Sequence, residues 1–220
     1  MRRPSDRGIA RVVATGKDRR VRSILPVATA TVVGYLAGSV PSADIATRLA
    51  LNGVSDLRTT GTGNPGALNA ATVLGRRWGG AVLAADVAKG ALAGAVGRAI
   101  AGPAGAYAGA TAAIGGHIVP AWSRGRGGKG VATSAGACLS VFPAYFPIDA
   151  VVAVAGAART RSAERATQVS CAAWVVASFA WWWRKLPNAW GPPPGPGLPV
   201  FAAFGSAMIL TKFRVTRRPE

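Results

Sequence analysis

The sequence is poor in the residues that build metal centres, disulfides and acidic active sites. Its 220 residues include only 8 Asp and Glu, one His and 2 Cys. One histidine and no carboxylate cluster argue against a catalytic metal site. Cys138 and Cys171 lie in separate apolar runs, which is typical of small buried hydrophobic residues and not of a disulfide or a metal-binding pair.

Charged residues are also scarce, and they are strongly one-sided. The 26 Lys and Arg give a formal net charge of +18, yet only 15% of the residues are charged and 50% are apolar. Nucleic-acid-binding domains of this charge carry more charged residues overall and interleave aromatic residues with basic ones, so a nucleic-acid partner is not indicated. Disorder is excluded for most of the chain because it has a large apolar surface to bury.

Long apolar runs between basic clusters indicate a multi-pass membrane protein. Several runs approach the roughly 20 residues that a helix needs to cross a bilayer. They cover residues 24–51, 79–101, 104–122, 131–157, 166–183 and 198–211. We expect an all-α polytopic fold with about five to seven transmembrane helices and glycine-rich loops, whose basic loops face the cytoplasm and anionic lipid.

The chain is expected to form one membrane domain over residues 24–211 between two basic tails. Residues 1–23 carry eight basic residues against two acidic ones and predict a solvated tail, and residues 212–220 form a second basic tail. Both the first tail and the loop after residue 51 are basic, and one crossing cannot place both in the cytoplasm. Three explanations are open: residues 24–51 are partly re-entrant, the tail crosses the membrane despite its charge, or the assigned start of the sequence lies too far upstream.

The first glycine-rich loop, residues 61–66, matches the pattern G-x-G-x-x-G. No strand precedes it, which excludes a dinucleotide-binding fingerprint. Its glycines allow backbone N–H groups to converge on an anion, and its Thr and Asn side chains add donors. The residues concerned are Gly61, Thr62, Gly63, Asn64 and Gly66. A simple Gly-Asn-Pro-Gly turn explains the same residues equally well.

The second glycine-rich loop, residues 123–130, is similar to a phosphate-binding P-loop. Gly130 stands where that motif needs Ser or Thr for magnesium, so the loop is not that motif. It could still hold phosphate, with Arg126 and Lys129 as charged donors beside the backbone of Gly127 and Gly128. The alternative is a cytoplasmic basic loop, which explains the arginines but not four glycines.

Three polar residues interrupt the apolar runs. A lone histidine such as His117 is more often a packed core residue, but near the membrane surface it could be a hydrogen-bond donor or a general base. Asp86 and Lys89 lie three residues apart on one predicted helix. Because intramembrane charges are costly, we expect these two to pair or to line a polar cavity, and pairing is the preferred interpretation.

Seven short motifs follow one another in the first two thirds of the chain. They are GYLAGSVPSA at 34–43, DLR at 56–58, GTGNPGALN at 61–69, LG at 74–75, DVAKG at 86–90, GHIVP at 116–120 and GGKGVAT at 127–133. In order and spacing the chain resembles the bacterial acyl-phosphate-dependent glycerol-3-phosphate acyltransferase family. The resemblance covers residues 30–140.

The resemblance implies a multi-pass enzyme of the bacterial plasma membrane with its active site at the cytoplasmic face. Such enzymes move an acyl group from acyl phosphate to the sn-1 hydroxyl of glycerol 3-phosphate, giving lysophosphatidic acid for phospholipid synthesis, with no cofactor, metal or obligate protein partner. Since acyl phosphate is already activated, the enzyme mainly positions two anions and stabilises developing charge.

The same resemblance implies roles for individual residues. Lys129 matches a functional lysine, Thr62 stands where the family has a functional serine, and His117 or a substrate phosphate takes the hydroxyl proton. The candidate substrate-binding residues are Gly61, Gly63, Asn64, Gly66, Asn69, Arg126, Gly127, Gly128, Gly130 and Arg165.

The chain departs from the family pattern at three places. Thr72 replaces an arginine, Arg165 stands on the second serine of an S-x-x-S stretch, and the C-terminal H-x-x-N-I-x-R segment is absent. We expect Arg165 to replace part of the missing cation, in which case Arg165→Ser lowers acyl transfer. The alternatives are a divergent paralogue with a changed acceptor and a non-catalytic membrane protein that binds lipid or phosphate. A transporter would need a continuous polar path, whereas the polar intramembrane residues gather toward one end.

Overall fold

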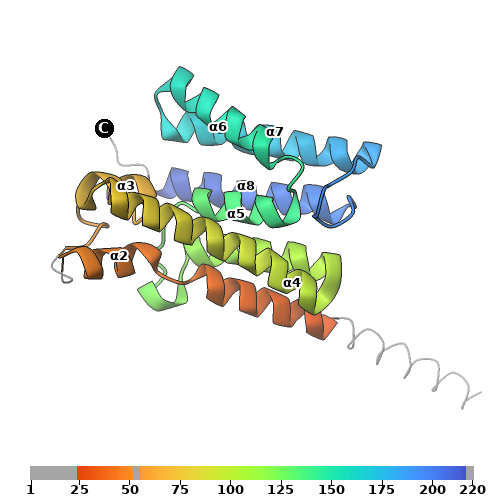
Figure 1. The fold of residues 1–220 in the computed structure, drawn as a ribbon, viewed down its shortest axis with the longest axis horizontal. Coiled ribbons are helices and arrows are strands. Elements are labelled where there is room, and N and C mark those ends of the chain that lie inside the picture. Colours follow the sequence, from red (N-terminus) through yellow and green to blue (C-terminus); the bar gives the residue numbers. More distant parts are fainter. Residues whose placement is uncertain (1–23, 52–54, 217–220) are drawn as a thin grey trace, which may run out of the picture.

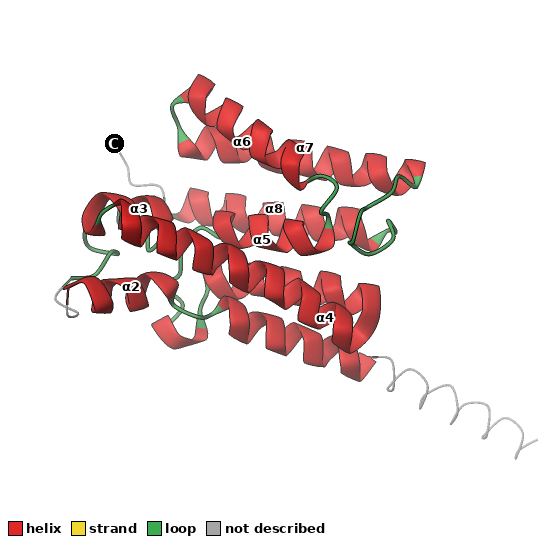
Figure 2. Ribbon diagram, viewed as in Figure 1, coloured by secondary structure: helices red, strands yellow, loops and turns green. Residues whose placement is uncertain are grey.

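The computed structural model describes residues 24–51 and 55–216, and within these ranges every regular element is helical (Figure 2). The predicted basic tail over residues 1–23 lies outside the described residues. A helix over residues 24–38 comes first. The later helices are α2 (Ser42–Leu51), α3 (Ala67–Leu74), α4 (Arg76–Ile118), the 3₁₀ helix η1 (Ala121–Ser123), α5 (Val131–Val141), α6 (Phe146–Thr160), α7 (Ala163–Arg184) and α8 (Gly197–Val215). The predicted all-α class is confirmed.

α4 is two antiparallel arms joined by a sharp bend. Ala101 and Gly102 leave the helical conformation, and Gly102 has φ of 60°, which glycine adopts at little cost. Pro103 follows and cannot donate a backbone hydrogen bond, so it begins a new helix rather than continuing the old one. We call residues 76–100 the first arm and residues 103–118 the second arm. The bend falls between the two apolar runs predicted at 79–101 and 104–122.

Glycines allow the helices to approach backbone to backbone. A Cβ on Gly34 would lie 2.2 Å from the Gly109 carbonyl oxygen, which places the helix over residues 24–38 directly on the second arm. On the first arm, a Cβ on Gly90 would lie 2.1 Å from the Thr133 carbonyl oxygen of α5. Small residues permit this close packing where lipid provides no hydrophobic drive for helix association.

The main core lies between the second arm, α5, α7 and α8. Ile114, Phe142 and Phe201 are at most 2% exposed within it. The Trp174 ring packs edge-on against Phe201 with centroids 5.1 Å apart. α6 and α7 form a hairpin, and α7 is the helix of this pair that contributes buried residues to the core (Figure 1).

Three described helical segments are long and apolar enough to cross a membrane: Ile24–Leu51, Arg76–Ser123 and Gly197–Val215. The middle segment contains both arms of α4. α8 continues to Val215, so residues 212–215, which were expected to belong to a basic tail, are helical. α2, α3 and the C-terminal end of α8 lie at the same end of the molecule (Figure 1).

Candidate active site

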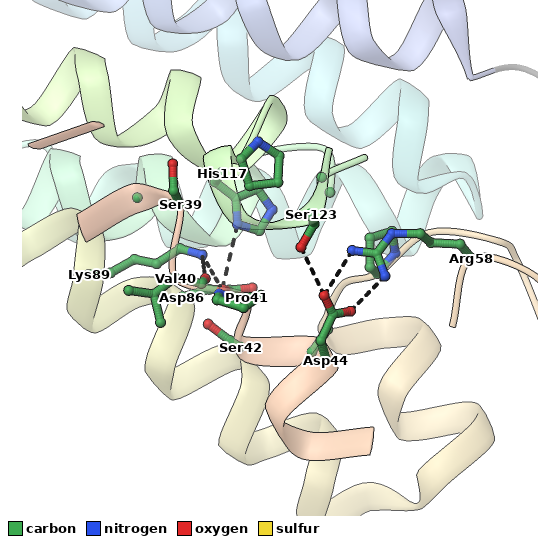
Figure 3. A pocket seen from close by; sticks show the side chains of 16 residues that line it. Ser39, Val40, Pro41, Ser42, Asp44, Arg58, Asp86, Lys89, His117 and Ser123 are labelled. Carbon is green, nitrogen blue, oxygen red and sulfur yellow. Dashed lines mark hydrogen bonds and ion pairs between the residues drawn. The ribbon is translucent and has the colours of Figure 1, made fainter. Parts of the chain in front are cut away.

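A small pocket at this end brings together segments that are far apart in the sequence (Figure 3). Pro65 of the first glycine-rich loop, Gly127 and Gly128 of the second, and His117 all line it. Asp44 of α2 contributes a carboxylate to the same wall. The two loops predicted to bind anions therefore face one space.

The first glycine-rich loop is shaped by one buried amide. Asn69, at the start of α3, is 1% exposed, and its Oδ1 accepts a hydrogen bond of 2.9 Å from the Thr62 N–H. Its Nδ2 donates to the carbonyls of Leu57 and Thr60 at 2.8 and 3.0 Å. The side-chain amide of Asn69 is thus directed at the loop backbone. Gly61 and Gly63 have φ of 57° and 73°, the left-handed region that favours glycine. Thr62 is exposed and Asn64 is half-buried.

The second glycine-rich loop is pressed against the end of α4. A Cβ on Gly127 would lie 1.9 Å from the His117 carbonyl oxygen, and a Cβ on Gly128 would lie 2.4 Å from His117 Nε2. The same Gly128 atom would be 3.2 Å from the Pro65 carbonyl oxygen of the first loop. Gly130, with φ of 86°, precedes α5. Close approach therefore accounts for glycines that a basic cytoplasmic loop leaves unexplained.

Arg58 ties three segments together, although sequence reasoning gave it no role. Its guanidinium donates to both Asp44 carboxylate oxygens, at 2.6 and 3.1 Å, and its Nε donates to the Arg126 carbonyl at 2.8 Å. Ser123 donates its hydroxyl to Asp44 at 2.9 Å. We call Arg58, Asp44 and Ser123 the Arg58 clamp. The sequence signal that could have found it is Asp44, an acidic residue inside the apolar run over residues 24–51.

The clamp perturbs the ionisation of the loop before α3. Burial alone would lower the pKa of Arg58, but hydrogen bonds and charge from Asp44 and Asp56 raise it. Burial alone would raise the pKa of Asp56, but Arg58 lowers it. The contact between Arg58 and Asp56 therefore favours the charged form of both groups.

Lys129 lies against the end of α8. Its Nζ is 4.1 Å from the centroid of the Phe213 ring, a cation–π contact. Burial lowers the pKa of Lys129, and the Glu164 carboxylate opposes this shift. Next to Phe213, Lys212 donates to the Ile118 carbonyl at 3.3 Å. The end of α8 thus contributes a second lysine to this site, which sequence reasoning had assigned to the tail.

The remaining candidates lie at the surface. Arg126 is exposed, and its carbonyl accepts from Arg58. Arg165 is exposed in the first turn of α7, where its N–H donates to the Ser162 hydroxyl. Thr72 donates its hydroxyl to the Leu68 carbonyl within α3. Among the described residues no group of three or more His, Cys, Asp and Glu could hold a metal ion.

Asp86 and Lys89 are paired as expected, with Lys89 Nζ 2.9 Å from Asp86 Oδ1. His117, from the other arm of α4, joins them with its Nδ1 3.5 Å from the same oxygen. This third member was not foreseen.

Comparison with known families agrees with this arrangement. The family described as glycerol-3-phosphate acyltransferase matches residues 28–218, which include both loops, α4 and α8. The chain belongs to this family.

Two curated glycerol-3-phosphate acyltransferases illustrate the similarity. The protein of Bradyrhizobium diazoefficiens is 35% identical over 166 residues, covering 76% of this chain and 81% of its own length. The protein of Rhizobium meliloti is 39% identical over 149 residues, covering 68% of this chain and 72% of its own length. The resemblance drawn from ordered motifs is confirmed.

The fold is that of an integral membrane protein. The crystal structure of PlsY (YgiH), an integral membrane glycerol 3-phosphate acyltransferase in its glycerol 3-phosphate form, superposes with a TM-score of 0.70. It is 24% identical, and the match covers 86% of this chain and 88% of that one. The predicted all-α polytopic membrane fold is confirmed.

Proposed function

We propose that this glycerol-3-phosphate acyltransferase family member transfers an acyl group from acyl phosphate to the sn-1 hydroxyl of glycerol 3-phosphate. The products are lysophosphatidic acid and inorganic phosphate, and the reaction belongs to phospholipid synthesis. The observation that carries the proposal is the meeting of both glycine-rich loops, His117 and the lysines of residues 129 and 212 at one end of the helices.

The reaction mainly requires two anion-binding sites, because both substrates carry phosphate. The hydroxyl oxygen bonds to the acyl carbon, the bond from that carbon to the phosphate oxygen breaks, and the phosphate leaves with the electron pair. Backbone N–H groups of the loops, with Lys129 and Arg126, neutralise the negative charge on both substrates. Positioning and charge stabilisation then supply most of the catalysis.

Lys212 supports anion binding in a chain that has Thr72 where its family has arginine. Among the described residues, the Lys212 ammonium group donates a hydrogen bond to the Ile118 carbonyl and forms no salt bridge. No carboxylate of the described residues therefore neutralises its charge. Arg165 remains the other candidate for this compensation. The variants Lys212→Met and Arg165→Ser distinguish these two candidates. Loss of the compensating cation should raise the KM for glycerol 3-phosphate about tenfold, and loss of the other should not.

An apolar groove supports a lipid-like acyl donor. It holds about 740 Å³ between the helix over residues 24–38, the second arm of α4 and α8. Tyr107, Phe204 and Met208 line it, and so does Gly115, which lies two residues before His117. Ala112→Phe should reduce turnover of long-chain acyl phosphates and spare short-chain ones, because a short chain does not fill the groove.

We place the protein in the bacterial plasma membrane with the pocket facing the cytoplasm. The long apolar segments support a membrane location. The basic residues near the second glycine-rich loop favour the cytoplasmic side, where positive loops are retained. Anionic lipid is the expected neighbour of these residues.

The direct test uses the purified protein in detergent or lipid nanodiscs. Palmitoyl phosphate and glycerol 3-phosphate are added, and lysophosphatidic acid is followed by mass spectrometry together with phosphate release. Equal amounts of the two products are expected, and Lys129→Met should lower the rate about 100-fold or more. Binding of both substrates with no product would instead indicate a non-catalytic member of the family.

A further inference from the structure

A buried group of three ionisable side chains lines the pocket (Figure 3). Asp86 and Lys89 come from the first arm of α4, and His117 comes from the end of the second arm. They are 2%, 8% and 8% exposed. We call these three residues the buried triad.

Burying the triad costs free energy that packing alone does not require. Charges removed from water lose solvation that their mutual attraction seldom restores, and apolar residues of similar volume often stabilise a protein as well or better. α4 shows that apolar packing was available, because its other buried residues are mostly Ala, Gly, Val and Ile. The triad therefore calls for a role beyond stability.

The contacts assign a different task to each member. Lys89 Nζ donates to the Val40 carbonyl at 3.0 Å while lying 2.9 Å from Asp86 Oδ1. That carboxylate oxygen is buried without a well-aligned hydrogen-bond donor. The imidazole nitrogen beside it is His117 Nδ1, 3.5 Å away, a distance that a small ring movement converts into a hydrogen bond. Lys89 balances the charge of Asp86, and His117 is the neighbour that can complete its hydrogen bonding.

The other imidazole nitrogen points toward the second glycine-rich loop. A Cβ on Gly128 would lie 2.4 Å from His117 Nε2, so only a glycine leaves this nitrogen room. His117 and Gly128 both line the pocket. From this geometry we infer that Asp86 is a positioning residue, which accepts the Nδ1–H of a neutral His117 and thereby keeps the unprotonated Nε2 directed at the pocket.

The role of this orientation in catalysis rests on the proposed acyl transfer, in which Nε2 of His117 is the proton acceptor. The sn-1 hydroxyl proton passes to Nε2 as its oxygen bonds to the acyl carbon, and the departing phosphate carries away the electron pair of the broken C–O bond. The resulting imidazolium then returns its proton to phosphate or water. Asp86 touches no substrate in this scheme and acts only through His117.

Several charged groups surround the imidazole. Asp86 and Lys89 face it from the first arm of α4. Asp44 and Arg58, which are paired with each other, line the same pocket from α2 and from the segment before the first glycine-rich loop. Lys212 approaches from α8 through the neighbouring Ile118 carbonyl.

The tautomer can be measured without any activity, because His117 is the only histidine in the sequence. Full-length protein labelled with ¹⁵N-histidine and purified through a histidine-free tag gives the ring signals of one residue. The Nδ1–H tautomer is expected in the wild type, and a mixture of tautomers is expected in Asp86→Asn. A wild-type ring that carries its proton on Nε2, or a ring unchanged by Asp86→Asn, would overturn the inference.

Activity separates positioning from charge balance. Asp86→Asn should lower kcat by about 100-fold with little change in KM for glycerol 3-phosphate. The double variant Asp86→Asn, Lys89→Met restores the net charge; it should stay as slow as Asp86→Asn if Asp86 positions His117, and recovery would mean that only charge balance matters. Asp149→Asn, a half-buried carboxylate of α6 outside this pocket, is the matched control. If the wild type makes no product while its imidazole behaves as described, the proposed function fails and the positioning role of Asp86 stands.

Discussion

The two glycine-rich loops face the same pocket but keep their shapes by opposite means. The first loop is organised by Asn69, whose three hydrogen bonds reach residues only 7 to 12 positions away. The second loop is held by distant segments: Arg58 contacts the Arg126 carbonyl across 68 positions, and Asp44 receives the Ser123 hydroxyl across 79. The first shape is local and is encoded in one stretch of sequence, whereas the second exists only after the helices have packed.

This contrast predicts different kinds of failure. A substitution that removes the contacts of the first loop should lower the stability of the protein. A substitution that removes the contacts of the second loop should instead shift the residues of the pocket in a protein that still folds.

The largest effect is expected for the close approach of the second loop to α4. Gly127→Ala would place a methyl group 1.9 Å from the His117 carbonyl oxygen, against backbone that cannot yield without moving the loop. We expect acyl transfer to fall about 100-fold, because a displacement of about 1 Å at a reacting centre costs that much. Initial rates on purified protein test this. Gly80→Ala, where nothing lies within 4 Å, is the control and should keep full activity.

The next effect concerns the stability of the first loop. Asn69→Ala removes three hydrogen bonds from a buried site, and at about 1 kcal/mol each the loss is about 3 kcal/mol. Thermal unfolding in detergent should show a clear decrease in Tm. Asn64→Ala, in the same loop and half-buried, should leave Tm nearly unchanged. Equal decreases in both variants would show that Asn69 has no special part in shaping the loop.

A smaller effect should follow from loosening the Arg58 clamp. Arg58→Lys keeps the charge but loses the two-pronged contact with Asp44 and the bond to the Arg126 carbonyl. We expect an increase of about tenfold in KM for glycerol 3-phosphate with a modest change in Tm. A double-mutant cycle with Asp44→Asn should give a coupling energy of about 1–2 kcal/mol. Arg124→Lys on the same loop is the control, and an equal effect there would remove the clamp from the explanation.

The smallest effect is one of pH. Burial lowers the pKa of Lys129, so its charge is lost on the alkaline side at a lower pH than that of an exposed lysine. The rate should therefore fall as pH rises through this pKa. Because the Glu164 carboxylate opposes the shift, Glu164→Gln should move the alkaline limb to lower pH. In Lys129→Arg the limb should disappear, since a guanidinium stays charged.

Much of the fold could be predicted because its signals are local. Apolar runs between basic clusters indicated the helices, and Gly102 followed by Pro103 separates two of those runs where α4 bends. The end of α8 was misjudged: Lys212 and Phe213 were assigned to a basic tail, whereas both pack at the site. Their charge resembled that of a tail, and only the burial of Phe213, at 5% exposure, marks them as part of the helix packing.

The two glycine-rich loops could be identified from the sequence as candidate anion-binding sites, whereas the way in which they meet other residues could not. Asp86 and Lys89 could be paired from their spacing, because residues three apart share one face of a helix. That His117 completes the group could not be foreseen, since it lies on the other arm of α4 and meets them only after the chain reverses at Gly102.

The sequence by itself determined the class of molecule, through apolar runs long enough for a bilayer and one-sided charge, and its glycine-rich loops predicted phosphate as a ligand. Those properties follow from composition and short-range spacing, which act before any tertiary contact forms. Only the tertiary structure decided which charges meet, joining Arg58 to Asp44, Lys129 to Phe213 and His117 to Asp86. Electrostatic and hydrogen-bond contacts depend on distances of a few ångströms, and between residues far apart in the chain such distances are set by helix packing.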